Sequence, residues 1–225
     1  MAQSFNPECR ACPRLATFLD EIKETHPSYF CAPVPAFGDD HPDLLIVGLA
    51  PGMHGANRTG RPFTGDAAGI LLYETLFALG LSNQATSIAA DDPLQLKGVR
   101  ISNAVKCLPP QNKPTTQEVL QCNTFLQQEI DQLPERCNLL ALGSIAHQAV
   151  LRCYKLKQSD MKFSHGAQHT LPDGRTLTDS YHCSRYNTQT RRLTPEMFSD
   201  VMRLAIQTTE ESPFARILWH RTAHG

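Results

Sequence analysis

Residues that could do chemistry are concentrated in one stretch of the chain, residues 48–66, which reads GLAPGMHGANRTGRPFTGD. Its glycines allow backbone to approach a ligand closely because they carry no Cβ. Phe63 offers a ring on which a flat ligand could stack, and Asp66 offers a carboxylate. The stretch has neither the Gly-Lys-Ser/Thr of a P-loop nor the Gly-x-Gly-x-x-Gly of dinucleotide folds. Taken alone, it could also be a structural loop with a core phenylalanine.

A second polar segment begins at Asn103 and continues as Ala-Val-Lys106-Cys107-Leu-Pro-Pro. An asparagine side chain carries one acceptor and two donors, so Asn103 could pair with the imide edge of uracil or thymine. It could equally be an ordinary turn residue. The sequence by itself leaves both interpretations open.

A third segment, residues 182–188, reads His-Cys-Ser-Arg-Tyr-Asn-Thr. His182 could donate a hydrogen bond to a developing oxyanion, although a single histidine is often structural. Phosphate groups could be held by the polar and basic side chains of this region, namely Ser184, Arg185, Thr188, Arg191 and Arg192.

Cysteines form the fourth feature, because four of the eight are arranged as two pairs, Cys9-x2-Cys12 and Cys107-x14-Cys122. Without a secretion signal, a disulfide framework is not expected. Four thiolates can hold either zinc or an iron–sulfur cluster, and the spacing does not choose between them.

The elements that must position these groups alternate between strands and helices. Continuous apolar runs predict buried strands at 43–49, 99–105 and 138–143, and residues 169–181 predict a hairpin that turns at Pro172-Asp173-Gly174. Helices are predicted at 8–25, 67–80, 115–133, 144–154 and 194–209. This order predicts an α/β fold with a mostly parallel sheet, in which the site lies beyond the carboxyl ends of the strands.

Composition is that of an ordinary globular protein, with 41% hydrophobic and 19% charged residues. No apolar run approaches the roughly 18 residues of a membrane helix, and the start MAQSFNPECR lacks a signal-peptide pattern, so a cytoplasmic location is expected. Residues 1–149 carry 10 Lys/Arg and 15 Asp/Glu, whereas residues 150–225 carry 11 and 7. The C-terminal third is therefore the candidate for binding nucleic acid. A single domain over 1–225 is expected, with a weakly patterned tail at 210–225.

Taken together and in this order, the four features resemble the uracil-DNA glycosylase superfamily, and within it family 5, the type B enzymes. GLAP…HGANRTGRPFTGD is similar to that family's first motif, SNAVKCLPP to its middle segment, and HCSRYNT to its final His-Pro-Ser motif. The resemblance runs from Cys9 to about Met202. It implies a three-layer α/β/α fold and a monomeric enzyme of base excision repair that removes uracil, and other deaminated bases, from DNA.

The resemblance also implies roles for individual residues. The base flips out of the helix, Phe63 stacks on it, Asn103 reads its Watson–Crick edge, His182 donates to the base oxygen, and Asp66 positions water and stabilises the cationic sugar. Gly48, Ala50 and Asn187 complete the pocket, and Arg185 and Tyr186 probe the DNA. A structural four-iron–four-sulfur cluster maps onto Cys9, Cys12, Cys107 and Cys122.

Two departures from the superfamily pattern stand out. Ala50 and Gly52 occupy the region where other families place a water-activating polar residue, which is a family 5 trait and suggests a roomier pocket that tolerates several damaged bases. Cys183 replaces the proline of His-Pro-Ser. Apart from Lys106, the loops offer no lysine nucleophile, so lyase activity is not expected. The alternatives are a catalytically inactive DNA-binding module of the same fold and a hydrolase of free nucleotides.

Overall fold

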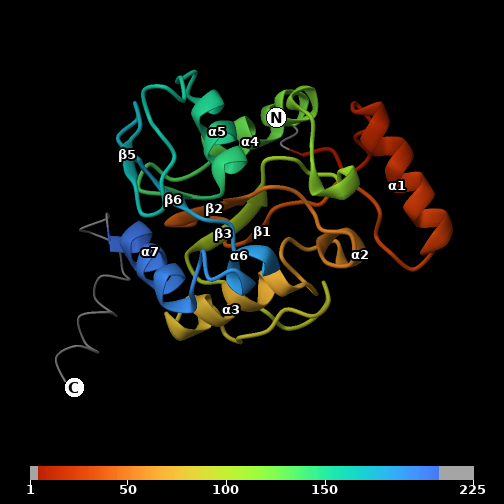
Figure 1. Cartoon of the computed structure of the whole chain (residues 1–225), viewed down its shortest axis with the longest axis horizontal. Coiled ribbons are helices and arrows are strands. Elements are labelled where there is room, and N and C mark those ends of the chain that lie inside the picture. Colours follow the sequence, from red (N-terminus) through yellow and green to blue (C-terminus); the bar gives the residue numbers. More distant parts are fainter. Residues whose placement is uncertain (1–4, 208–225) are drawn as a thin grey trace.

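The computed structural model describes residues 5–207, whose strands form one six-stranded sheet in the order β1-β3-β2-β4-β6-β5 (Figure 1). The strands are β1 (Phe37–Gly38), β2 (Leu44–Gly48), β3 (Val99–Asn103), β4 (Asn138–Leu142), β5 (Gln168–Thr170) and β6 (Thr176–Ser180). The four inner strands pair in parallel, whereas β1 and β5 are antiparallel edges. The predicted, mostly parallel sheet is thus confirmed, and β5–turn–β6 is the predicted hairpin.

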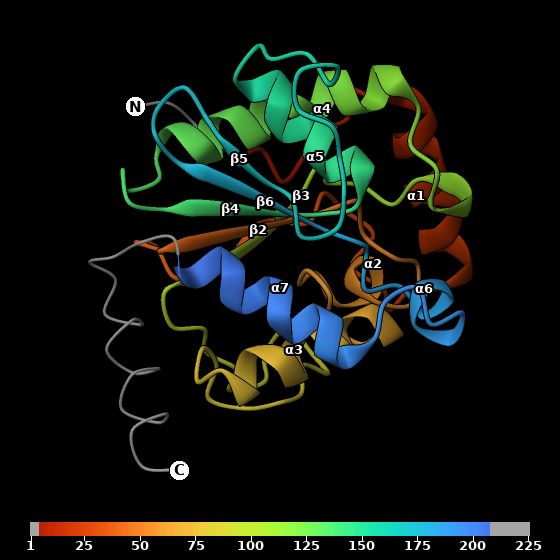
Figure 2. The ribbon, with the colours of Figure 1, turned by 60° about the vertical axis from the view of Figure 1, so that its left-hand side comes forward.

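Helices cover both faces of this sheet. They are α1 (Pro13–Thr25), α2 (Ala56–Thr59), α3 (Ala67–Ala78), α4 (Thr116–Asp131), α5 (Ser144–Cys153), α6 (Arg185–Gln189) and α7 (Pro195–Gln207), with a 3₁₀ turn at Pro110–Asn112. In Figure 2, α4 and α5 lie on one side of the sheet, and α3 and α7 lie on the other. This confirms the three-layer α/β/α arrangement. No helix within residues 5–207 combines the length and apolar character needed to span a membrane.

The apolar strands explain the two cores. In β2, Ile46 contributes to the core under α3 and α7, while Leu45 and Val47 contribute to the core under α4 and α5. Because successive side chains of a strand point to opposite faces, a strand buried on both sides must be apolar throughout. All five residues of β2 are buried, as are those of β4.

Local capping groups set where the helices begin. Thr115 and Glu118 form a reciprocal capping box at the start of α4, and the Thr194 hydroxyl accepts from the amide of Met197 at the start of α7. The expectation of a helix from residue 8 is wrong at its start, because α1 begins at Pro13. Cys9 and Cys12 therefore precede the helix rather than lying on it. Proline fits the first helical turn because it has no N–H to leave unpaired.

Two short helices, α2 and α6, lie inside segments that the sequence predicts to be irregular loops. They stiffen the segments that follow β2 and β6, at the carboxyl edge of the sheet. The predicted tail at 210–225 lies outside the described residues.

Candidate active site

A pocket of about 590 Å³ opens at the carboxyl edge of the parallel strands, as the α/β pattern predicts. This volume is typical of a small-molecule site. The predicted site residues among its lining are Ala50, Phe63, Asp66, Asn103, His182, Ser184 and Arg185. Side chains from three distant segments of the chain therefore meet at one cavity.

Gly48, at the end of β2, does not itself line the pocket but permits the approach of two residues that do. A Cβ built on Gly48 would overlap the Asn103 side-chain oxygen and lie 2.6 Å from Cζ of Phe63. Real Cβ atoms do not tolerate such contacts, so any larger residue would push the ring and the amide apart. The glycine is explained by this close approach.

The backbone of Phe63 has the left-handed value φ 53°, which is uncommon for a residue with a side chain. Gly69 in α3 packs directly against the Phe63 carbonyl, and a Cβ there would overlap it. The Tyr73 hydroxyl donates to the neighbouring Pro62 carbonyl oxygen at 2.8 Å. The ring is thus buried and held from α3, and it faces the His182 ring with centroids 6.0 Å apart.

The two carboxylate oxygens of Asp66 have different surroundings: one accepts a hydrogen bond and the other lies against glycines. Oδ1 accepts from the amide of Gly69 at 3.0 Å and so caps α3. Oδ2 lies against Gly55 and Gly52: a Cβ on Gly55 would overlap it, and one on Gly52 would lie 3.1 Å away. The carboxylate therefore occupies space that only glycine leaves free. Helix capping fixes its position without using both oxygens.

Asn103 is nearly fully buried at the end of β3, and its Oδ1 has no hydrogen-bond partner. Buried polar atoms are nearly always paired, so each exception calls for an explanation. Asn103 lines the pocket, so a ligand there can supply the missing donor.

Burial lowers the pKa of His182 from its ordinary value, and the nearby Asp66 carboxylate acts in the opposite direction without cancelling the effect. The ring is therefore neutral around pH 7 and can donate one N–H. Asn187 does not line the pocket, in contrast to the expectation; its side-chain amide donates to the His182 carbonyl at 2.8 Å. Asn187 thereby holds the backbone of His182.

Residues after His182 form α6 at the rim of the pocket. Ser184 caps this helix by accepting from the amide of Asn187 at 3.4 Å, and Thr188 donates to the Arg185 carbonyl at 3.0 Å. Tyr186 is 71% exposed, and Arg185 and Arg191 are exposed as well. The rim therefore presents cations and an aromatic ring to the outside.

A fourth strand end contributes lining residues that the sequence analysis missed, namely Gly143, Ser144 and Ile145 after β4. The signal was available, because β4 was predicted as a parallel strand and its carboxyl end must reach the same edge. Gly143 has φ 96° and stands at the N-cap of α5, so the N-terminus of this helix lines the pocket.

The four paired cysteines lie around one small cavity, lined by Cys9, Cys12, Cys107 and Cys122 with apolar neighbours such as Leu15 and Val105. Desolvation raises the pKa of Cys107 to about 12, and the neighbouring thiols act in the same direction. Four thiolates around one cavity can hold either a zinc ion or an iron–sulfur cluster.

The fold and the pocket define an α/β protein with an aromatic ring, an amide, a carboxylate and a neutral imidazole around one cavity. The family model described as the uracil DNA glycosylase superfamily matches residues 35–205. A type-5 uracil-DNA glycosylase of Thermus thermophilus is 48% identical over 86% of this chain and 90% of its own length. One of Pyrobaculum aerophilum is 41% identical over 88% and 87%, and one of Mycobacterium leprae 43% over 87% and 89%.

Identities of this size over most of both chains place the protein within a family. The chain belongs to the uracil-DNA glycosylase superfamily and, within it, to the type-5 family. The motif-based resemblance is thereby confirmed.

Proposed function

We propose that the protein is a monofunctional uracil-DNA glycosylase of base excision repair, which hydrolyses the bond between a damaged base and its deoxyribose. The unpaired Asn103 amide oxygen, buried in a pocket beside the Phe63 ring, is the observation that carries this proposal. Uracil offers a ring N–H and a carbonyl oxygen side by side on its Watson–Crick edge. Asn103 can accept from the first and donate to the second.

Binding begins when the damaged nucleotide leaves the duplex, which costs a few kcal/mol of stacking and pairing. Stacking of the extruded base on Phe63 returns about 1–3 kcal/mol. The left-handed backbone of Phe63 and the contacts from α3 hold the ring in place before the base arrives. Cytosine is disfavoured because its edge presents the opposite donor and acceptor pattern to Asn103.

As the glycosidic bond breaks, negative charge grows on the base and positive charge on the sugar. His182 is assigned to the base oxygen, to which a neutral imidazole donates without requiring a proton to be lost or gained. The N-terminus of α5 lines the same pocket, and its helix dipole favours negative charge there. Asp66 is assigned to the sugar and the attacking water, because its Oδ2 is not needed for capping.

The small residues Gly52 and Ala50 are consistent with the assignment of Asp66 to the sugar and the attacking water. A side chain at Gly52 would crowd Asp66 Oδ2 at 3.1 Å, so glycine there keeps space around the carboxylate. Other families place a water-activating polar residue in this region. Here Asp66, at the start of α3, takes over part of that role. The small residues also enlarge the pocket, which supports acceptance of other deaminated bases.

DNA contacts are assigned to the rim around α6, where Ser184, Arg185, Thr188 and Arg191 hold backbone phosphates and the exposed Tyr186 fills the vacated stack. Lyase chemistry is not proposed, because Lys106 is turned away from the pocket. Its ammonium donates to both oxygens of Glu129, at 2.7 and 2.9 Å, and to Ser102.

We further propose that Cys9, Cys12, Cys107 and Cys122 hold a four-iron–four-sulfur cluster. Four thiols around one apolar cavity fit such a group, and the resemblance to the iron–sulfur-containing family favours it over zinc. When bound, it supplies a structural cross-link between the segment before α1 and the segment after β3. Anaerobically purified protein should be brown, with about four irons per chain. Colourless protein containing zinc would contradict the assignment.

The chain is also proposed to act as a single domain, as a monomer and in the cytoplasm. One continuous sheet supports the first point, because both cores are built on its two faces. The second is supported by one pocket that holds all the proposed catalytic groups, and the third by the proposed role in DNA repair.

The test is a labelled oligonucleotide containing uracil opposite guanine or adenine, or in a single strand, treated with protein and then alkali. Cleavage at the uracil in wild type, and its loss in Asp66→Asn, is the expected result. Binding without cleavage would indicate an inactive DNA-binding module, and turnover restricted to free nucleotides would indicate a nucleotide hydrolase. Panels with hypoxanthine and xanthine would rank the other deaminated bases.

A further inference from the structure

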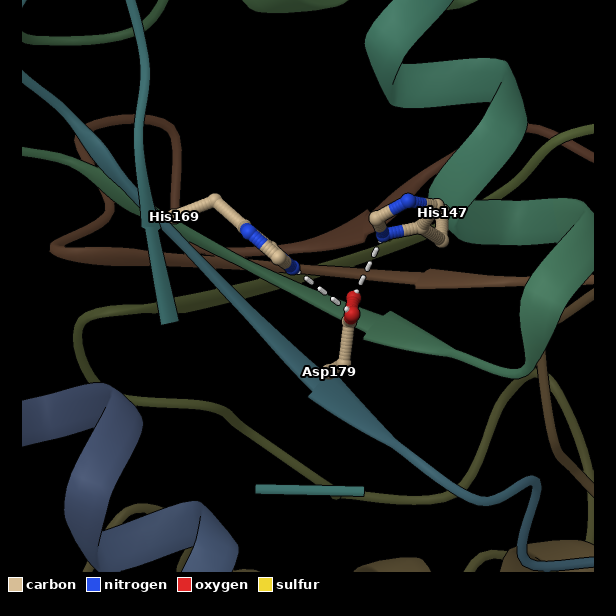
Figure 3. A group of neighbouring side chains, drawn as sticks. All are labelled: His147, His169 and Asp179. Carbon is tan, nitrogen blue, oxygen red and sulfur yellow. Dashed lines mark hydrogen bonds and ion pairs between the residues drawn. The ribbon is translucent and has the colours of Figure 1, made fainter. Parts of the chain in front are cut away.

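Away from the pocket, three side chains from three elements meet between the sheet and α5. They are His147 of α5, His169 of the edge strand β5 and Asp179 of β6 (Figure 3). His147 Nδ1 lies 2.7 Å from Asp179 Oδ1, and His169 Nε2 lies 3.1 Å from Asp179 Oδ2. The mechanism proposed above uses none of these groups.

The arrangement leaves one nitrogen of each ring aimed at a carboxylate. Nε2 of His147 lies 2.9 Å from the Met161 carbonyl oxygen, which can only accept, so the ring proton belongs on Nε2. In a neutral ring, Nδ1 then carries a lone pair that faces the acceptor oxygen of Asp179. Something positively charged is required between them, either an additional proton or a metal ion.

We propose that His147, His169 and Asp179 form a zinc site, with a water molecule as the fourth ligand. Two histidines and one carboxylate are a common zinc ligand set. A backbone carbonyl that holds the second nitrogen of a ligating histidine is typical of metal sites, because it fixes the tautomer that leaves the other nitrogen free. Met161 supplies that carbonyl to His147.

The spacing is close to what zinc requires. The three ligand atoms lie within 4.8 Å of one another. Bonds of about 2.0–2.2 Å in a tetrahedron separate ligand atoms by roughly 3.3–3.6 Å. Each histidine faces a different oxygen of Asp179, His147 at 2.7 Å and His169 at 3.1 Å. Binding of one zinc ion through a single oxygen therefore requires the carboxylate to turn and the His147 pair to open by about half an ångström.

His169 is the most exposed of the three side chains. The side chains of His147 and Asp179 are fully buried, whereas that of His169 is 13% exposed and comes from an edge strand. The metal would fasten the β5–β6 hairpin to α5. Because β6 leads directly to His182, it would also brace the segment that carries this residue.

Zinc binding is tested without DNA, so its outcome is independent of the proposed glycosylase activity. Wild type, His169→Gln and the control His41→Gln, which alters an exposed histidine elsewhere, are loaded with zinc sulfate, dialysed and analysed for metal. Wild type and His41→Gln should retain about one zinc per chain more than His169→Gln. Zinc should also raise the melting temperature of the first two proteins but not that of the third.

The cysteines are a competing site, so the ligand type must be measured as well. X-ray absorption at the zinc edge should show nitrogen and oxygen neighbours near 2.0–2.1 Å rather than sulfur near 2.3 Å. Equal zinc content in wild type and His169→Gln, or a shell of sulfur alone, would overturn the proposal and leave a protonated histidine–carboxylate network in its place.

Discussion

Asn103 and Lys106 are close neighbours in sequence and both are buried, yet their polar groups are in opposite situations. The Asn103 amide oxygen faces the pocket without a partner. The Lys106 ammonium, between β3 and α4, is satisfied by Glu129 and Ser102. Residues of the same segment thus belong to two regions, the pocket and the layer under α4.

The difference teaches how to separate function from stability in this molecule. A satisfied buried pair is costly to break because its partner is left charged and unpaired. An unsatisfied buried group already carries its desolvation cost, and a ligand that pairs with it recovers that energy. Substitutions in the layer under α4 should therefore affect folding, and substitutions in the pocket should affect turnover.

The largest effect is expected for Lys106→Met, which leaves Glu129 buried without its cation. The free energy of unfolding, measured by urea denaturation, should fall by about 3–5 kcal/mol. The double variant Lys106→Met/Glu129→Leu should recover most of this loss. Lost turnover with unchanged stability would mean that the lysine acts in the reaction and would break the comparison.

Asp66→Asn should lower single-turnover cleavage of uracil-containing DNA by about 10²–10³-fold, because it removes a charge placed at the developing cation. Asparagine caps helices as well as aspartate does, so α3 and the melting temperature should be preserved. DNA binding, measured by fluorescence anisotropy, serves as the control and should not change. Normal turnover would exclude the carboxylate from the mechanism.

Asn103→Ala should cost about 1–3 kcal/mol in kcat/KM for uracil, since one buried pairing with the base is lost. Unfolding free energy should change little, because the amide oxygen has no protein partner to lose. The matched comparison with Lys106→Met is direct: one variant loses activity and the other loses stability. Full activity on uracil would refute the edge-reading role.

The smallest effect concerns pH. The pKa of His182 is lowered in the folded protein from an ordinary value of 6.5, mainly by burial. At a pH between the lowered pKa of His182 in the folded protein and its ordinary pKa in the unfolded chain, the unfolded chain binds more protons than the folded one. The free energy of unfolding therefore falls as the pH falls through this range. Wild type should therefore lose more stability than His182→Gln between about pH 7.5 and pH 5. Parallel pH profiles would show that His182 titrates normally.

Much of the architecture could be predicted from the chain, because it depends on local patterns. The apolar runs at β2, β3 and β4 and the turn at Pro172-Asp173-Gly174 lie within a few residues of the structure they specify. The start of α1 was missed, since the apolar pattern of a helix does not reveal where its backbone hydrogen bonds begin.

For the site, the sequence by itself determined the residue types and the strand ends that bring Phe63, Asp66, Asn103 and His182 to one edge. Only the tertiary structure decided which polar atoms are left unpaired, because pairing depends on neighbours distant in sequence. It also revealed the close approaches that require Gly48 and Gly55, and the meeting of His147, His169 and Asp179. Sequence motifs indicate which functional groups are present, whereas tertiary packing decides which of them remain free to bind a ligand.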